Sequence, residues 1–135
     1  AAGLYSYDEF RDRHFFISSD IEHGVLKASI NEFAELRIRR DVNAPWLGRA
    51  TFADHPSGIK VAHVPAVDRD SGIDYRRSVI TVNGSRGIVE YDGDVDHLIF
   101  YHPNLTFEPG EHQVEVSVYD RTGNLSERSY RLTLP

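Results

Sequence analysis

The stretch HQVEVSVYDRTGNLSERSYRLTLP, residues 112–135, decides the fold class of this chain. In its first half, valines alternate with polar residues, and in its second half Tyr130, Leu132 and Leu134 alternate with polar residues in the same way. An alternation of period two is typical of β-strands that bury one face and expose the other. The polar residues 120–124 between the two halves therefore predict the turn of a β-hairpin.

Three residues of this turn have a structural role that the sequence alone explains. The carboxylate of Asp120 is expected to accept backbone N–H groups two or three residues further on. Gly123 is suited to a left-handed conformation, and Asn124 is suited to capping the turn. The turn therefore accounts for all three residues, and cation binding by Asp120 is the alternative.

The period-two pattern recurs upstream. The dipeptide Asn83-Gly84 best tolerates the positive φ angles of a tight hairpin turn, so a second hairpin is predicted there, with Ile80 and Val82 before it and Ile88 after it. No window has a convincing helical period. Further strands are predicted in these ranges: around 4–7, 14–17, 25–30, 36–38, 59–67 and 98–101.

Many short strands with frequent turn signals predict an all-β protein that forms a sandwich or a barrel. Residues 41–135 have the size of an immunoglobulin-like antiparallel β-sandwich, which is about 100 residues. Residues 1–40 are too few to form such a domain alone, so they are predicted to be an additional N-terminal β-segment. This segment either adds strands to the sandwich or ends a preceding β-domain, and DVNAPWLG, residues 41–48, marks the boundary.

The composition excludes several classes of function. The chain has 135 residues, 15 lysines and arginines, 21 aspartates and glutamates, and a formal net charge of −6. No basic cluster is present to neutralise phosphates, so nucleic acid is not expected as a partner. The absence of cysteine excludes disulfides and thiolate chemistry. No apolar run approaches the roughly 18 residues of a membrane span, so membrane insertion is not expected.

The motifs DRDSGIDYRRSVITVNG, from Asp68, and EPGEHQVEVSVYDRTGN, from Glu108, resemble those of bacterial immunoglobulin-like (Big-type) modules. The resemblance covers roughly residues 66–134. Such modules belong to multidomain surface and secreted proteins, so the resemblance implies an extracellular or cell-envelope location. It also implies a non-catalytic accessory module that serves as a spacer or in docking or adhesion. The implied partners are neighbouring domains of the parent protein, another surface protein or a glycan, and no cofactor is implied.

A second resemblance supports a calcium-binding alternative. The segments RRDVNAP, VDRDSG and VYDRTGN are similar to the linker, loop and strand end of calcium-binding cadherin repeats. Calcium takes six to eight oxygen ligands. The glutamate of the cadherin strand entry and the Asp-Arg-Glu motif are missing from this chain, which leaves the ligand set short. On this alternative the module is adhesive and calcium-rigidified, with these ligands: Asp41, Asn43, Asp68, Asp70 and Asp120.

Trp46 is the candidate for carbohydrate binding, because aromatic side chains form the platforms on which sugars stack. The structural alternative is that its ring packs between the first forty residues and the sandwich. This residue lies in the boundary segment 41–48.

The seven histidines raise the question of a zinc site. His55 and His63 are eight residues apart, and His97 and His102 are five apart, but neither spacing is that of a known zinc motif. Scattered surface histidines explain them. No acid and base pair with a nucleophile emerges either, so the chain is not expected to be an enzyme.

Overall fold

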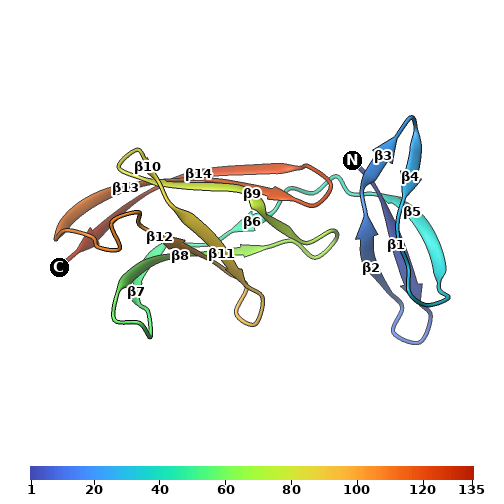
Figure 1. Cartoon of the computed structure of the whole chain (residues 1–135), viewed down its shortest axis with the longest axis horizontal. Helices are drawn as coiled ribbons and strands as arrows, with labels where there is room; N and C mark the ends of the chain where they lie inside the picture. The colour runs from blue at the N-terminus through green and yellow to red at the C-terminus, as the bar shows by residue number, and fades with distance from the viewer.

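The computed structural model describes all 135 residues, and every strand in it pairs antiparallel with its neighbours (Figure 1). The predicted all-β class and the antiparallel β-sandwich are confirmed. No helix of the structure has the length and hydrophobicity that a membrane span requires.

Residues 46–134 form the two sheets of the sandwich. In the first sheet the strand order is β10-β9-β13-β14, with β9 Ile73–Val82, β10 Ser85–Arg86, β13 Gly110–Asp120 and β14 Leu125–Leu134. In the second sheet the order is β11-β12-β8-β6, and β7 also pairs with β8. Its strands are β6 Trp46–Leu47, β7 Thr51–Asp54, β8 Lys60–Val67, β11 Ile88–Asp92 and β12 His97–Tyr101.

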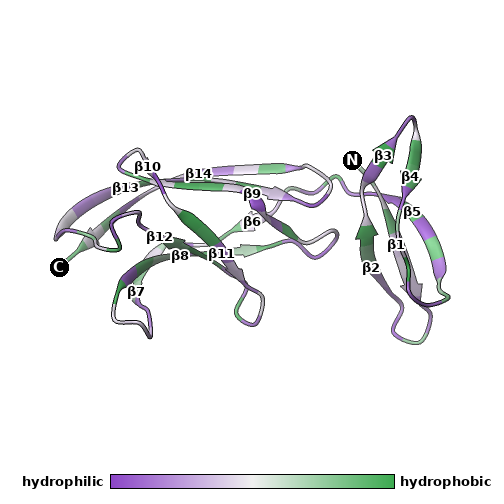
Figure 2. Ribbon diagram, in the orientation of Figure 1, coloured by the Kyte–Doolittle hydropathy of each residue, from purple (hydrophilic) through white to green (hydrophobic).

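The core lies between these two sheets, where the alternating apolar residues of the sequence face one another. The valines of β13 are buried, and Leu98 and Phe100 of β12 oppose them with no exposed surface. Figure 2 shows apolar residues along β8, β11 and β12 of the sandwich. Burial of these side chains supplies most of the driving force for folding of this unit.

The hairpin predicted at Asn83-Gly84 is only partly correct. Both residues have positive φ, 51° and 80°, as a tight hairpin turn requires. Only Ser85 and Arg86 then pair with β9, whereas the next strand, β11, pairs with β12 in the other sheet. The chain changes sheets at Gly87, where a Cβ atom would lie 2.1 Å from the carbonyl oxygen of Tyr101. Only glycine allows this close approach, because it has no side chain.

Residues 1–40 form two small sheets of their own, and none of their strands pairs with a strand of the sandwich. One sheet has the order β2-β1-β5, with β1 Ala2–Asp8, β2 Arg13–Ser18 and β5 Glu35–Arg40, and the other consists of β3 Asp20–Glu22 and β4 Val25–Lys27. Tyr5 is the one hydrophobic side chain of this segment that is buried. The segment therefore has almost no core of its own.

The N-terminal sheets lie at one end of the sandwich, and the C-terminus lies at the other end (Figure 1). The β8–β9 loop and the β13–β14 turn face them. The hydroxyl of Ser19 donates to the carbonyl oxygen of Arg121 at 2.5 Å, and the Arg121 guanidinium lies 5.8 Å from the ring centre of Phe16. The linker residue Asp41 accepts a hydrogen bond at its carbonyl oxygen from the Asn124 amide group at 3.2 Å. The linker and both loops thus meet at this junction.

Candidate metal centre

Three aspartates converge at the junction between the N-terminal sheets and the sandwich. Asp41 lies in the linker, directly after β5, Asp68 begins the β8–β9 loop, and Asp120 ends β13. One carboxylate oxygen from each lies within 4.8 Å of the other two. Asp41 is 3% exposed and Asp120 is fully buried. The structure therefore brings together three of the five residues that the sequence analysis named as possible calcium ligands.

Asp120 is held in place by its own turn, as the sequence analysis predicted. Its Oδ1 accepts hydrogen bonds from the backbone amides of Thr122 and Asn124 at 2.8 and 2.9 Å. The Thr122 hydroxyl donates to the same oxygen at 3.1 Å, and the Asn124 side-chain amide donates to Oδ2 at 2.6 Å. These four bonds fix the position of a buried carboxylate.

Asp68 is fixed in a similar way by the loop that follows it. Its Oδ2 accepts from the backbone amides of Ser71 and Gly72 at 2.8 and 2.5 Å, and from the Ser71 hydroxyl at 3.0 Å. All three bonds reach Oδ2, so Oδ1 carries none of them. Both Asp68 and Asp120 therefore present oxygens whose positions are set by backbone geometry.

Asp41 has the least satisfied carboxylate of the three. Its Oδ1 accepts from the Asn43 amide at 3.0 Å, but its buried Oδ2 has no hydrogen-bond partner. Burial raises the pKa of Asp41, and the negative charges of Asp68 and Asp120 raise it further. The Ser71 hydroxyl and the Asn43 backbone amide oppose this increase. The Ser71 hydroxyl lies near enough to Asp41 to lower its pKa, but its one hydrogen is donated to Asp68, so Oδ2 of Asp41 has no hydrogen-bond partner.

The other two predicted ligands, Asn43 and Asp70, bind to each other instead. The side-chain amide of Asn43 donates to Oδ2 of Asp70 at 3.0 Å on the exposed side of the junction. Asp70 is not part of the three-carboxylate cluster. This hydrogen bond ties the linker to the β8–β9 loop, which brings Asp41 close to Asp68.

None of the three carboxylates takes part in a salt bridge, and the N-terminal ammonium donates to the backbone carbonyl oxygen of Asp41 at 2.7 Å and not to its carboxylate. The salt bridges of the molecule all lie elsewhere, on exposed parts of both units. Oxygen donors without nitrogen or sulfur suit hard cations such as Mg²⁺, Mn²⁺ and Ca²⁺. The donor set therefore fits a hard divalent cation.

Tyr5 is a neighbour of the cluster that the sequence analysis missed. Burial raises its pKa to about 12, the charge of Asp41 adds to this, Arg39 opposes it, and Asp70 and Asp68 contribute further. Its ring meets Phe16 edge-on, with centroids 5.4 Å apart. The most buried side chain of the N-terminal segment thus lies beside the acidic junction.

Trp46 lies near the cluster. The structural alternative predicted that its ring packs between the two units, but the ring does not do so. Its side chain is 62% exposed at the start of β6, and it lines a shallow depression with Asn43 and Asp70. A Cβ atom at Gly48 would lie 2.9 Å from the ring, so the ring covers that glycine.

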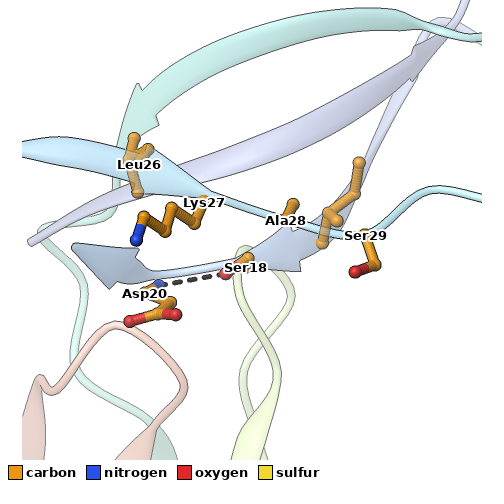
Figure 3. Close-up of a pocket in the computed structure, with 7 residues that line it drawn as sticks. Ser18, Asp20, Leu26, Lys27, Ala28 and Ser29 are labelled. Carbon is orange, nitrogen blue, oxygen red and sulfur yellow. Dashed lines mark hydrogen bonds between the residues drawn. The ribbon is translucent and has the colours of Figure 1, made fainter. Parts of the chain in front are cut away.

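Another surface depression lies between β2 and β4 (Figure 3). Figure 3 shows the backbone N–H of Asp20 donating to the Ser18 hydroxyl, at 3.0 Å, on one side of it. The ammonium group of Lys27 is paired with Glu22. Asp20 and Lys27 are the titratable residues of its lining, and they form no group of carboxylates like that of the junction.

No model of a known protein family matches the chain, and no curated protein matches it. A solved structure that it resembles is CopC from Methylosinus trichosporium OB3b, with a TM-score of 0.47 and 19% sequence identity. The similarity covers 66% of this chain and 91% of that chain. It concerns the β-sandwich architecture alone and identifies no ligand of this protein.

Two predictions are corrected by these findings. The chain was expected to be a non-catalytic accessory module for spacing, docking or adhesion, with a calcium-rigidified or carbohydrate-binding module as the alternative. The structure instead brings three carboxylates of this chain together in a group that could hold a metal ion. The expectation of no cofactor is corrected as well, because these three carboxylates, one with a buried oxygen that has no hydrogen-bond partner, form a group that could hold a metal ion. Sequence spacing does not show this convergence.

Proposed function

We propose that this protein is a metal-binding module in which Asp41, Asp68 and Asp120 bind one hard divalent cation. The observation that carries the proposal is the buried Oδ2 of Asp41, which has no hydrogen-bond partner and lies among two other carboxylates. Buried polar atoms in native proteins are nearly always paired. A cation between the three carboxylates supplies the missing partner.

The electrostatics of the cluster favour the same ion. Two unit charges 4.8 Å apart repel each other by roughly 3.5 kcal/mol at an effective dielectric constant of about 20, and by about 0.9 kcal/mol in bulk water. Three carboxylates contain three such pairs. A divalent cation at their centre converts this repulsion into attraction, so binding of the ion stabilises the junction.

The three carboxylates provide only part of the coordination shell of the ion. Three carboxylates fill about half of an octahedral or larger shell, and water fills the remainder. Asp68 and Asp120 are fixed by backbone hydrogen bonds, so the site is largely formed before the ion binds. This preorganisation lowers the cost of binding.

Ion binding has a structural consequence, because the ligands come from both sides of the junction. Asp41 continues directly from β5 of the N-terminal sheet, whereas Asp68 and Asp120 belong to the sandwich. The ion therefore fixes the end of β5, and with it the N-terminal sheets, relative to the sandwich. We treat these two ranges as separate units, which the absence of shared strand pairs supports.

The wider setting is also part of the proposal. The resemblance to bacterial immunoglobulin-like (Big-type) modules supports an extracellular or cell-envelope location and neighbouring domains of the parent chain as partners. The acidic net charge of −6 argues against nucleic acid as a partner. We propose no catalytic role for this module.

The test is metal titration of the whole chain, with the apo protein prepared in chelator. We expect Mg²⁺, Mn²⁺ or Ca²⁺ to raise the melting temperature. At an ion concentration of 100 times the dissociation constant, the free energy of unfolding should increase by about 2.7 kcal/mol. Asp41→Asn and Asp68→Asn should abolish the increase. Asp94→Asn, in the exposed β11–β12 turn, is the matched control and should keep it. An unchanged melting temperature with all three ions at millimolar concentration would contradict the proposal.

A further inference from the structure

The outer face of the second sheet holds a pair of histidines that the aspartate site does not involve. His63 lies on β8 and His97 begins β12, and these strands pair with His63 opposite Ile99 and His97 opposite Pro65. The two histidines are therefore diagonal neighbours on one face of the sheet. Both side chains are half-buried, since the core side chains of these strands occupy the opposite face.

The distance between the two rings is suited to an ion. The Nδ1 atoms of His63 and His97 are 3.1 Å apart, and the rings are perpendicular with centroids 5.4 Å apart. Imidazole nitrogens bind zinc at about 2.0–2.1 Å, so two of them on one ion at angles of roughly 90–110° lie about 2.8–3.4 Å apart. The observed separation falls inside this interval.

The protonation state and the surroundings favour a cation as well. Burial and the neighbouring His97 lower the pKa of His63, and the Asp92 carboxylate opposes this decrease. His63 is thus neutral near pH 7, which is the form that binds metal. Asp92 lies directly opposite His97 in the strand register. Its Oδ1 accepts from the Asp94 amide at 3.0 Å, which holds the carboxylate at this edge of the pair.

The geometry points to a second metal site, in which His63 and His97 bind a borderline divalent cation such as Zn²⁺ or Cu²⁺ through their Nδ1 atoms. Water fills the remaining positions, together with the Asp92 carboxylate after a change of rotamer. Nitrogen ligands select this class of ion, whereas the all-oxygen cluster of Asp41, Asp68 and Asp120 selects hard cations. The two sites are therefore chemically distinct, and this inference does not depend on the aspartate site.

The experiment titrates the whole chain with Zn²⁺ by calorimetry and with Cu²⁺ by electron paramagnetic resonance. We expect one Cu²⁺ with hyperfine coupling to two nitrogens. His63→Gln and His97→Gln should each weaken Zn²⁺ affinity tenfold or more. His23→Asn is the matched control, because His23 lies exposed at the β3–β4 turn with a positive φ that asparagine tolerates. It should bind Zn²⁺ like the wild type.

Two results would overturn the inference. One is an affinity that neither His63→Gln nor His97→Gln changes, which means that the rings only share a hydrogen bond. The other is an equal loss in the His23→Asn control, which means scattered surface binding. If His63→Gln fails to fold, His97→Gln decides alone, because His97 is the first residue of its strand. Asp41→Asn serves as the cross-check and should leave Zn²⁺ binding unchanged.

Discussion

Replacing Asp41 by asparagine should have opposite effects on the apo and the metal-bound protein. In the apo protein the charge of Asp41 is repelled by Asp68 and Asp120, so its removal is stabilising. Asparagine keeps an oxygen that accepts from the Asn43 amide, and its new N–H groups face two carboxylates. With metal present, the same substitution removes a ligand. We therefore expect Asp41→Asn to be more stable than wild type in chelator and to gain nothing from added cation.

The expected size follows from the distances in the cluster. Two charge pairs at 4.8 Å, the upper limit of the separations in the cluster, contribute about 2 kcal/mol at the dielectric constant of water and roughly 7 kcal/mol at a value of about 20. Asp68 is partly exposed, so water screens part of the repulsion, and the lower figure is the minimum expected gain. A gain of about 2 kcal/mol raises the melting temperature of a protein of this size by about 6–10 °C.

The pH dependence of this gain follows from the raised pKa of Asp41. A carboxyl group whose folded pKa lies above its ordinary value of 3.8 stabilises the fold below that value, where it is protonated in both states. This stabilisation is lost as the pH rises through the folded pKa. The advantage of Asp41→Asn should therefore be small below pH 3.8 and grow towards neutral pH.

Thermal melts in chelator and in excess Mg²⁺ or Ca²⁺, at several pH values, measure all of these effects. Asp94→Asn serves again as the control for removal of one acidic charge from the surface. A variant that is less stable than wild type in chelator at neutral pH would refute the reasoning. Such a result means that the Asp41 carboxylate already has a favourable partner in the apo fold.

Three further predictions concern other parts of the fold. Asp120→Ala removes the acceptor of the Thr122 and Asn124 backbone amides and of the Thr122 hydroxyl. This cost exceeds the gain from relieved carboxylate repulsion, so urea unfolding should show a net loss of about 3 kcal/mol; a loss below about 1 kcal/mol, like that expected for Asp94→Ala, would contradict it. Gly87→Ala places a Cβ atom 2.1 Å from the Tyr101 carbonyl oxygen, so the free energy of unfolding should fall by about 3 kcal/mol in the same assay. A variant as stable as the wild type would show that the chain shifts freely there. Tyr5 should ionise only near pH 12 in an ultraviolet titration, and Tyr5→Phe should remove this one late-titrating group. The stability that the neutral form of Tyr5 contributes below pH 10.0 is lost as the pH rises towards 12. Identical titration curves for the two proteins would refute this.

Local pattern was sufficient to predict the longer strands and several turns, but not the short strands β3, β6, β7 and β10. The alternation in residues 112–134 predicts β13 and β14, and the polar residues between them predict their turn, because both features depend on neighbours in the sequence. The hydrogen bonds of Asp120 follow from the same local geometry. The sheet change at Gly87 was not predictable, because a strand of period two looks the same in either sheet of a sandwich.

The candidate sites depend on contacts between residues that are far apart in the sequence. Resemblance suggested five ligands, but Asn43 and Asp70 pair with each other and only three carboxylates converge. The histidine pair was missed because His63 and His97 are 34 positions apart and meet only through the register of β8 with β12.

The sequence by itself therefore determined the all-β class, the longer strands and the turn that holds Asp120, since these follow from periodicity and local hydrogen bonding. Only the tertiary structure decided which carboxylates and which imidazoles face one another. The physical reason is that the positions of side chains across strands and loops are set by sheet register and by packing at the junction. Neither is encoded in the spacing of residues along the chain.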